Sequence, residues 1–137
     1  MAGATLLPQY AWLKPLLFPA GQLTELRRNI SIYTERGGTI ACLISPEHSV
    51  VVDTQFPEQA GNLITLMQGL NAKPLDLLVN THHHGDHTSG NIAFKDMVST
   101  HVAHANSRAN QERVARERDQ LETTLLPTTT YEEEFSQ

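Results

Sequence analysis

The feature that most constrains this chain is a short apolar run that leads directly into a group of histidines. The run LDLLVN, at residues 75–80, has the length and composition of a buried strand, and THHHGDH follows it at once. Four of the chain's seven histidines and one aspartate therefore lie within six positions. Sheets of the α/β class commonly place their sites at the carboxyl ends of strands. The sequence thus predicts an α/β fold with a polar site just after residues 75–80.

The segments before this site predict three strands and a helix. Strand-like patterns occupy residues 30–34, 39–45 and 49–53, with short polar turns between them. Apolar residues then recur at spacings of three and four, which predicts a helix from Pro57 to about Leu70. The third strand, VVVD, is apolar throughout, so we expect it to be covered on both faces.

The segments after the site predict smaller elements of the same kinds. We expect a short helix at residues 89–94, a strand at 98–103, and a polar surface helix from Asn106 or Ser107 to about Leu121. The stretch TTTYEEEF near the end has the composition of the start of a further strand.

The length of the chain predicts one modest domain preceded by a leader. We assign residues 1–28 to the leader and residues 29–137 to the domain. The formal charge of −5 offers no basic surface for nucleic acid, so nucleic acid is not expected as a partner. The leader is apolar but broken by three prolines, so it does not predict a membrane span. It is either the remnant of an export signal, which would make the protein exported or periplasmic, or the leader of a cytoplasmic protein.

The first three histidines of the cluster predict that two of them can bind one metal ion. If the backbone is still extended after the strand, alternation places His82 and His84 on one side and His83 on the other. One alternative is a fragment of a purification tag, but a tag would be terminal. Another is a cluster without metal, which would crowd four imidazoles and a carboxylate together with no cation to share. We therefore interpret the cluster as a metal site.

The rest of the cluster predicts a second metal position beside the first. Gly85 allows the chain to bend sharply, so that Asp86 and His87 reach a neighbouring position. Imidazole and carboxylate ligands suit zinc best, with iron or manganese as alternatives where carboxylates dominate.

These residues also carry a resemblance to a known family. The segment THHHGDH resembles the T-H-x-H-x-D-H signature of the metallo-β-lactamase superfamily, and the order of strand, helix and strand around VVVDT is similar too. The resemblance runs from about Asn29 to the carboxyl terminus. It implies the amino-terminal half of that family's αββα sandwich, in which a mixed sheet carries helices on its outer face.

The resemblance implies a hydrolase that uses a metal-activated water. His82 and His84 would be two of the three histidines of the first metal position, while Asp86 and His87 would belong to the second. Asp86 would also orient the nucleophile or receive its proton, which is a catalytic role. The complete site of the family holds two zinc ions and acts on small molecules with acyl, ester, lactam or related groups.

The same resemblance implies two supporting residues and several missing ligands. Asp53 and Thr81 would support the metal loop, although Gln55 stands where a glycine usually follows. The family completes its site with a histidine, a bridging aspartate and a final histidine further downstream. After the cluster this chain has only His101 and His104, for which we expect surface or capping roles.

The resemblance therefore also implies that the chain forms only part of a domain. One face of its sheet would be apolar and uncovered, a feature typical of surfaces that associate. A second copy of the chain or a missing carboxyl-terminal half would cover it. As an enzyme, the chain would therefore be inactive on its own. The alternative is a non-catalytic module of the same fold that binds metal or forms a homodimer.

Overall fold

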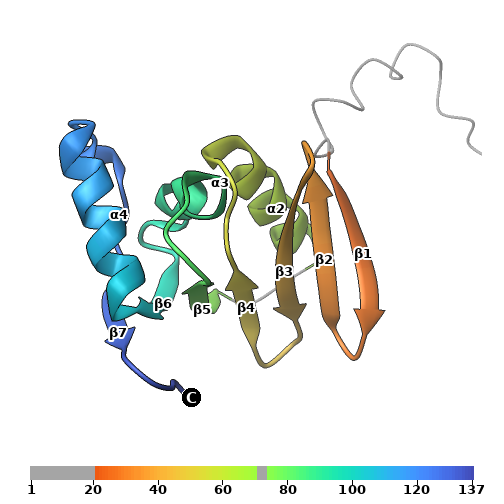
Figure 1. Cartoon of the computed structure of the whole chain (residues 1–137). Coiled ribbons are helices and arrows are strands. Elements are labelled where there is room, and N and C mark those ends of the chain that lie inside the picture. Colours follow the sequence, from red (N-terminus) through yellow and green to blue (C-terminus); the bar gives the residue numbers. More distant parts are fainter. Residues whose placement is uncertain (1–20, 71–73) are drawn as a thin grey trace, which may run out of the picture.

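A computed structural model describes residues 21–70 and 74–137, so most of the predicted leader lies outside the described residues (Figure 1). The strands are β1 (Gln22–Arg27), β2 (Ile30–Glu35), β3 (Gly38–Ile44), β4 (Ser49–Val52), β5 (Leu75–Asn80), β6 (Val98–His104) and β7 (Thr129–Tyr131). The helical segments are α2 (Pro57–Gly69), α3 (Gly85–Thr88), η2 (Ser89–Phe94), α4 (Ala105–Glu117) and η3 (Leu121–Thr123). In the described ranges, no helix has both the length and the apolar character needed to cross a membrane.

One mixed sheet contains all seven strands in their order along the chain (Figure 1). Strands β1 to β4 are antiparallel, whereas β4 to β7 are parallel and are joined through the helical segments. Val52 of β4 pairs with Val79 of β5. The residues that follow these two strands therefore emerge side by side at one edge of the sheet. This mixed sheet with its helices confirms the predicted α/β class.

Most predicted elements are confirmed, with two differences at their limits. The sheet begins at Gln22, inside the stretch that the sequence assigns to the leader. The pattern did not identify β1 because this edge strand is almost wholly exposed and carries little apolar periodicity. Helix α4 begins at Ala105, earlier than predicted, because the ring of His104 caps it by accepting a hydrogen bond from the backbone N–H of Asn106. The helix ends at Glu117, before the predicted end at about Leu121.

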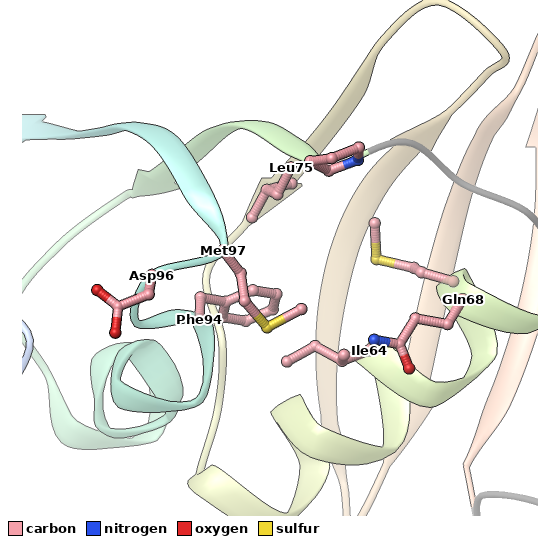
Figure 2. A pocket seen from close by; sticks show the side chains of 8 residues that line it. Ile64, Gln68, Leu75, Phe94, Asp96 and Met97 are labelled. Carbon is pink, nitrogen blue, oxygen red and sulfur yellow. The ribbon is translucent and has the colours of Figure 1, made fainter.

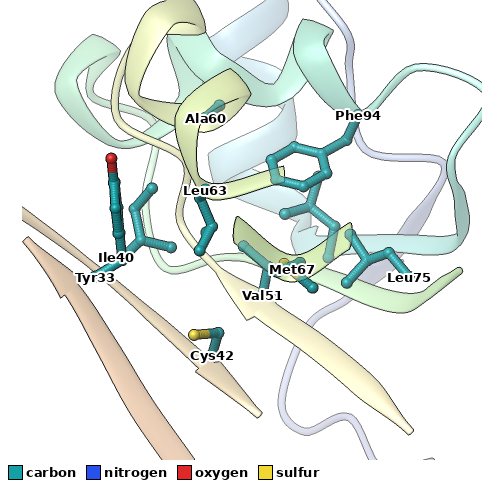
Figure 3. Close-up of a cluster of buried hydrophobic side chains, with 10 residues drawn as sticks. Tyr33, Ile40, Cys42, Val51, Ala60, Leu63, Met67, Leu75 and Phe94 are labelled. Carbon is teal, nitrogen blue, oxygen red and sulfur yellow. The ribbon is translucent and has the colours of Figure 1, made fainter. Parts of the chain in front are cut away.

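The hydrophobic core lies between α2 and one face of the sheet (Figure 3). Ala60, Leu63 and Met67, which recur along α2, form a single cluster with residues of the sheet such as Val51. Phe94 of η2 closes the same cluster and is 1% exposed. The core thus places α2 and η2, which lie on either side of the histidine segment in the sequence, against the same face.

From β2 to β5 the described residues leave the other face of the sheet partly exposed, whereas Val102 of β6, on that same face, is 0% exposed. Side chains of β4 alternate between buried and partly exposed, so the prediction that this strand is covered on both faces is wrong. Helix α2 and η2 pack against the opposite face, where the core lies. The partly exposed apolar side chains of the open face are Ile32, Ala41, Leu43, Val50, Val52, Leu77 and Val79.

Candidate metal site

Asp53 anchors the segment that contains the histidines, which we call the histidine loop (residues 81–90). Asp53 directly follows β4, and its backbone N–H donates to the carbonyl of Val79 at 2.8 Å. Its carboxylate accepts hydrogen bonds from the backbone N–H of Thr81 at 2.8 Å and from the Thr81 hydroxyl at 2.7 Å. Because Asp53 is 6% exposed, these bonds are shielded from water. The carboxylate therefore holds the first residue of the loop at the end of β5.

The same carboxylate determines which nitrogen of two imidazoles carries the proton. Nδ1 of His87 lies 2.8 Å from Oδ2 of Asp53, so it must donate to the carboxylate. The Thr81 hydroxyl already donates to Asp53, so it accepts from Nδ1 of His82 at 3.0 Å. In the neutral form of either imidazole, Nε2 is then the nitrogen without a proton. This arrangement is typical of metal-binding histidines, whose second nitrogen donates to a carboxylate or a similar acceptor.

The free nitrogen of His87 lies close enough to a carboxylate oxygen to share a cation with it. The rings of His82 and His87 have centroids 4.1 Å apart, and Nε2 of His87 lies 3.6 Å from Oδ2 of Asp86. Two ligands of a tetrahedral zinc ion, each about 2.0–2.1 Å from the metal, lie roughly 3.3 Å apart. His87 and Asp86 are therefore at nearly the separation that a shared ion requires, and the donor set fits zinc.

The oxygens of Asp53 are already engaged, although Asp53 lies close enough to two imidazoles to be a candidate ligand itself. Ligand atoms of Asp53, His82 and His87 all lie within 4.8 Å of one another. However, three donors already occupy the oxygens of Asp53: the amide and hydroxyl of Thr81 and the ring of His87. Binding a metal through these oxygens would remove the bonds that orient both imidazoles.

Of the other two histidines of the loop, His84 is exposed, whereas His83 is only partly exposed, like His82 and His87. The ring of His84 contacts both His82 and His83, with centroids 4.8 Å apart in each case. Burial and the nearby His84, His82 and Arg113 lower the pKa of His83. The ring of His82 lies closer to that of His87, at a centroid distance of 4.1 Å, than to that of His84, at 4.8 Å, and so it contacts a ring on either side.

The chain turns at Gly85 through a short helix. Gly85 is the first residue of the single-turn helix α3 and has no positive φ. The carbonyl of His84 accepts hydrogen bonds from the backbone N–H groups of His87 and Thr88, at 3.0 and 3.1 Å. A turn of helix therefore brings Asp86 and His87 round towards the ring of His82, without the left-handed backbone that only glycine adopts readily.

Left-handed backbone occurs instead beside Asp53. Asp53 and Gln55 have φ values of 62° and 52°. The side chain of Gln55 is buried, and its Nε2 has no hydrogen-bond partner. Its carbonyl accepts from the N–H of Gly90 at 2.8 Å, and a Cβ at Gly90 would lie 2.3 Å from the carbonyl oxygen of Thr54. This close approach requires glycine at position 90, and it joins the end of the histidine loop to the segment after β4.

Two cavities lie at opposite ends of β5. One, of about 360 Å³, lies near Leu75 and is lined mainly by apolar side chains, including Phe94 and Met97 (Figure 2). The other, of about 520 Å³, borders the histidine loop and is lined by His83, His84 and residues of α4. Only the second adjoins the proposed ligands, so the first has no part in the metal site.

The sequence did not identify His101 or the buried side chain of Asn80 as part of the surroundings of the site. His104 has the predicted capping role, but the prediction of a surface or capping role for His101 is wrong: it is 2% exposed. Its Nε2 donates to Oδ1 of Asn80 at 2.9 Å, and Nδ1 has no partner. Burial lowers the pKa of His101 from 6.5 to about 4. The pairing of β5 with β6, which sequence periodicity does not specify, places this ring in the interior.

Comparisons with known proteins agree with this architecture. The sequence model of the metallo-beta-lactamase superfamily matches residues 34–123, more than half of the chain. No curated protein sequence matches it.

The solved structures that this chain resembles include several metallo-β-lactamases. DIM-1 has 19% sequence identity and a TM-score of 0.63, and the match covers 83% of this chain and 52% of DIM-1. FIM-1 from Pseudomonas aeruginosa, in its mono-zinc form, has 19% identity and a TM-score of 0.63, with 85% and 51% covered. MEM-A1, a subclass B3 metallo-β-lactamase from a soil metagenome library, has 21% sequence identity and a TM-score of 0.58. The match covers 64% of this chain and 34% of MEM-A1. The chain thus spans a third to a half of the length of these structures.

Proposed function

The chain belongs to the metallo-β-lactamase superfamily, and on this premise we propose that its histidine loop is part of the zinc site of a hydrolase. The hydrogen bonds of Asp53 are the observation that supports this most directly, because they leave Nε2 of His82 and His87 free for a cation. The mono-zinc form of FIM-1 supports the choice of zinc. Iron and manganese are the alternatives, and a complete site would hold two ions.

Each residue of the site has a role within this proposal. The proposed metal ligands are His82, His84, Asp86 and His87. Asp53 and Thr81 orient the imidazoles. A bound zinc ion supplies a Lewis acid that lowers the pKa of water towards about 7 and polarises an acyl or phosphoryl oxygen. The carboxylate of Asp86 lies at the exposed side of the site, where it can orient the attacking water and accept its proton. The proposed substrate is a small molecule with an ester, lactam or related acyl group.

We further propose that this chain alone supplies only part of the ligand set. All seven histidines of the sequence lie in the described residues. Outside the loop, His101 is buried against Asn80, and both ring nitrogens of His104 are engaged, with Glu132 and Asn106. His48 lies at the opposite end of β4. With so few ligands, we expect the 137-residue chain to bind zinc weakly and to hydrolyse its substrate poorly until further ligands are provided.

Zinc titration of the purified chain tests this proposal. We expect saturable, weak binding that His87→Ala reduces by about tenfold or more, since it removes both a ligand and a partner of Asp53. His48→Ala is the matched control and should leave the affinity unchanged. Equal affinities of the wild type and His87→Ala would contradict the metal site. Turnover of nitrocefin or an ester that His84→Ala abolishes would contradict the proposed incompleteness.

A second candidate function is a homodimerising module, which the open sheet face favours. Seven apolar side chains of that face are partly exposed, and two such faces can pack against each other as in a sandwich. We expect light scattering after size-exclusion chromatography to show a dimer that Val50→Lys converts to a monomer, because the lysine would be buried without a partner. Thr65→Lys, on the exposed side of α2, is the control. A wild-type monomer with and without zinc would exclude this candidate.

A further inference from the structure

Two buried asparagines join the ends of the histidine loop, and we call their side chains the amide clasp (Asn80 and Asn91). Asn80 is the last residue of β5, and Asn91 lies in η2. Each Nδ2 donates to Oδ1 of the other residue, at distances of 3.0 and 2.8 Å. Both side chains are buried, at 0% and 1% exposure. The pair therefore closes the loop at its base by two reciprocal hydrogen bonds shielded from water.

The position of the clasp relates it directly to the proposed ligands. The histidine loop consists of the ten residues between the two asparagines, so every proposed ligand of the loop lies inside the segment that the clasp closes. Apart from the clasp, the ends of this segment are held by the sheet, by the core and by hydrogen bonds to Asp53 and Gln55. With the ends fixed, the loop has fewer conformations in which its imidazoles point apart.

Thr54 connects the clasp to a ligand. Its hydroxyl lies 2.9 Å from Oδ1 of Asn91 and 3.1 Å from the carbonyl oxygen of His87. Its backbone N–H donates to that same carbonyl at 2.8 Å. Because Thr54 follows Asp53, the backbone and the ring of His87 are held by adjacent residues. A single residue, Thr54, thus links the clasp to His87, whose ring faces the proposed cation position.

Further polar groups hold the clasp itself in place. Oδ1 of Asn80 also accepts from Nε2 of His101 at 2.9 Å and from Nε2 of Gln111 at 3.3 Å. Nδ2 of Asn91 lies 3.3 Å from the carbonyl oxygen of Leu125. These contacts come from β6, α4 and the segment after η3. Buried polar groups that are satisfied from several elements restrict a structure to one arrangement.

We propose that Asn80 and Asn91 are positioning residues, which hold the histidine loop in the conformation that presents its imidazoles to a cation. They touch neither the proposed metal nor a substrate, and they act through the backbone on both sides of the loop. The inference rests on the proposed metal site for its effect on affinity, but the ordering of the loop is a property of the metal-free chain.

The experiment combines amide hydrogen exchange with cobalt binding on the full 137-residue chain. In metal-free Asn91→Ala we expect the protected amides of Thr81, His87 and Gly90 to exchange at least tenfold faster, while those of Tyr33 and Ile40 are unchanged. Cobalt affinity, followed by the visible absorption of the bound ion, should fall by about 10- to 100-fold. The double variant Asn80→Ala/Asn91→Ala should lose little more affinity than either single variant, because the two side chains act as one unit.

Two further variants guard against a simple loss of folding. Thr54→Val keeps the shape of the side chain and removes only the hydroxyl, and it should give the same local pattern with a smaller effect. Ser107→Ala removes a partner of Gln111 at the far end of the buried group and should change neither readout. Uniformly faster exchange throughout the chain, or an unchanged loop, would overturn the positioning role. If the wild type binds no cobalt, the proposed metal site fails, whereas faster exchange confined to the loop would still support the clasp.

Discussion

Zinc affinity is expected to fall by about 100-fold when Asp53 is replaced by asparagine, in a chain that remains folded. The carboxylate accepts three hydrogen bonds, and an amide can accept only at its oxygen. If that oxygen keeps the N–H of Thr81, the amide NH₂ faces the Thr81 hydroxyl and Nδ1 of His87. Nδ1 must then accept a hydrogen bond, so the ring proton moves to Nε2 and the ligand lone pair is lost.

The effect should exceed that of removing any single ligand. Asp53 determines the proton position of His87 directly and that of His82 through Thr81, so one substitution impairs two imidazoles. Asparagine is suited to the backbone here because it tolerates the left-handed φ of 62° better than most residues. We therefore expect the far-ultraviolet circular dichroism of the variant to match that of the wild type.

Competition with a chromophoric chelator would measure this loss, with Asp76→Asn as the matched control. Asp76 is also a carboxylate that accepts a backbone N–H, that of Ser49 at 2.8 Å, but it lies near the start of β5, at the opposite end from the histidine loop. Its replacement should leave zinc affinity unchanged. Equal affinities of Asp53→Asn and the wild type would show that the carboxylate does not control the ligands.

The stability of the chain is expected to fall by about 3 kcal/mol through His101 alone as the pH drops from 6.5 to 4. Burial lowers the pKa of this histidine to about 4 in the folded chain, against 6.5 for an exposed imidazole. Between these values the unfolded chain binds a proton that the folded chain does not, so the free energy of unfolding decreases with decreasing pH. One pKa unit corresponds to about 1.4 kcal/mol. The contribution is complete above pH 6.5 and is lost as the pH falls to 4.

Urea unfolding of the wild type and of His101→Gln, at several pH values between 4 and 7, would measure this contribution. Glutamine does not titrate, and its NH₂ can retain the donor to Oδ1 of Asn80. The difference in unfolding free energy between the two proteins should shift by about 3 kcal/mol in favour of the variant at pH 4. The titration of carboxylates and of the other histidines is common to both and cancels. Parallel pH profiles would contradict the prediction.

Local sequence patterns were sufficient to predict most of the framework. Pro57 and the apolar spacing after it predicted α2, and the run LDLLVN predicted β5. Both depend on residues that are close in the sequence, where periodicity and turn chemistry act. The same patterns did not predict β1, and they wrongly predicted that both faces of β4 are covered. Edge strands and open sheet faces depend on which distant segments pack against them, and local patterns do not contain that information.

What the sequence by itself determined is the order of the elements and the types of side chain in the histidine loop. The tertiary structure decided how those side chains are oriented. Asp53 and His87 are 34 positions apart, yet one hydrogen bond between them decides which nitrogen of the imidazole is free. His101 and Asn80, 21 positions apart, are joined through the parallel pairing of β5 and β6. A proton is located by the acceptor within about 3 Å of it, and that acceptor is supplied by packing between distant segments rather than by spacing along the chain.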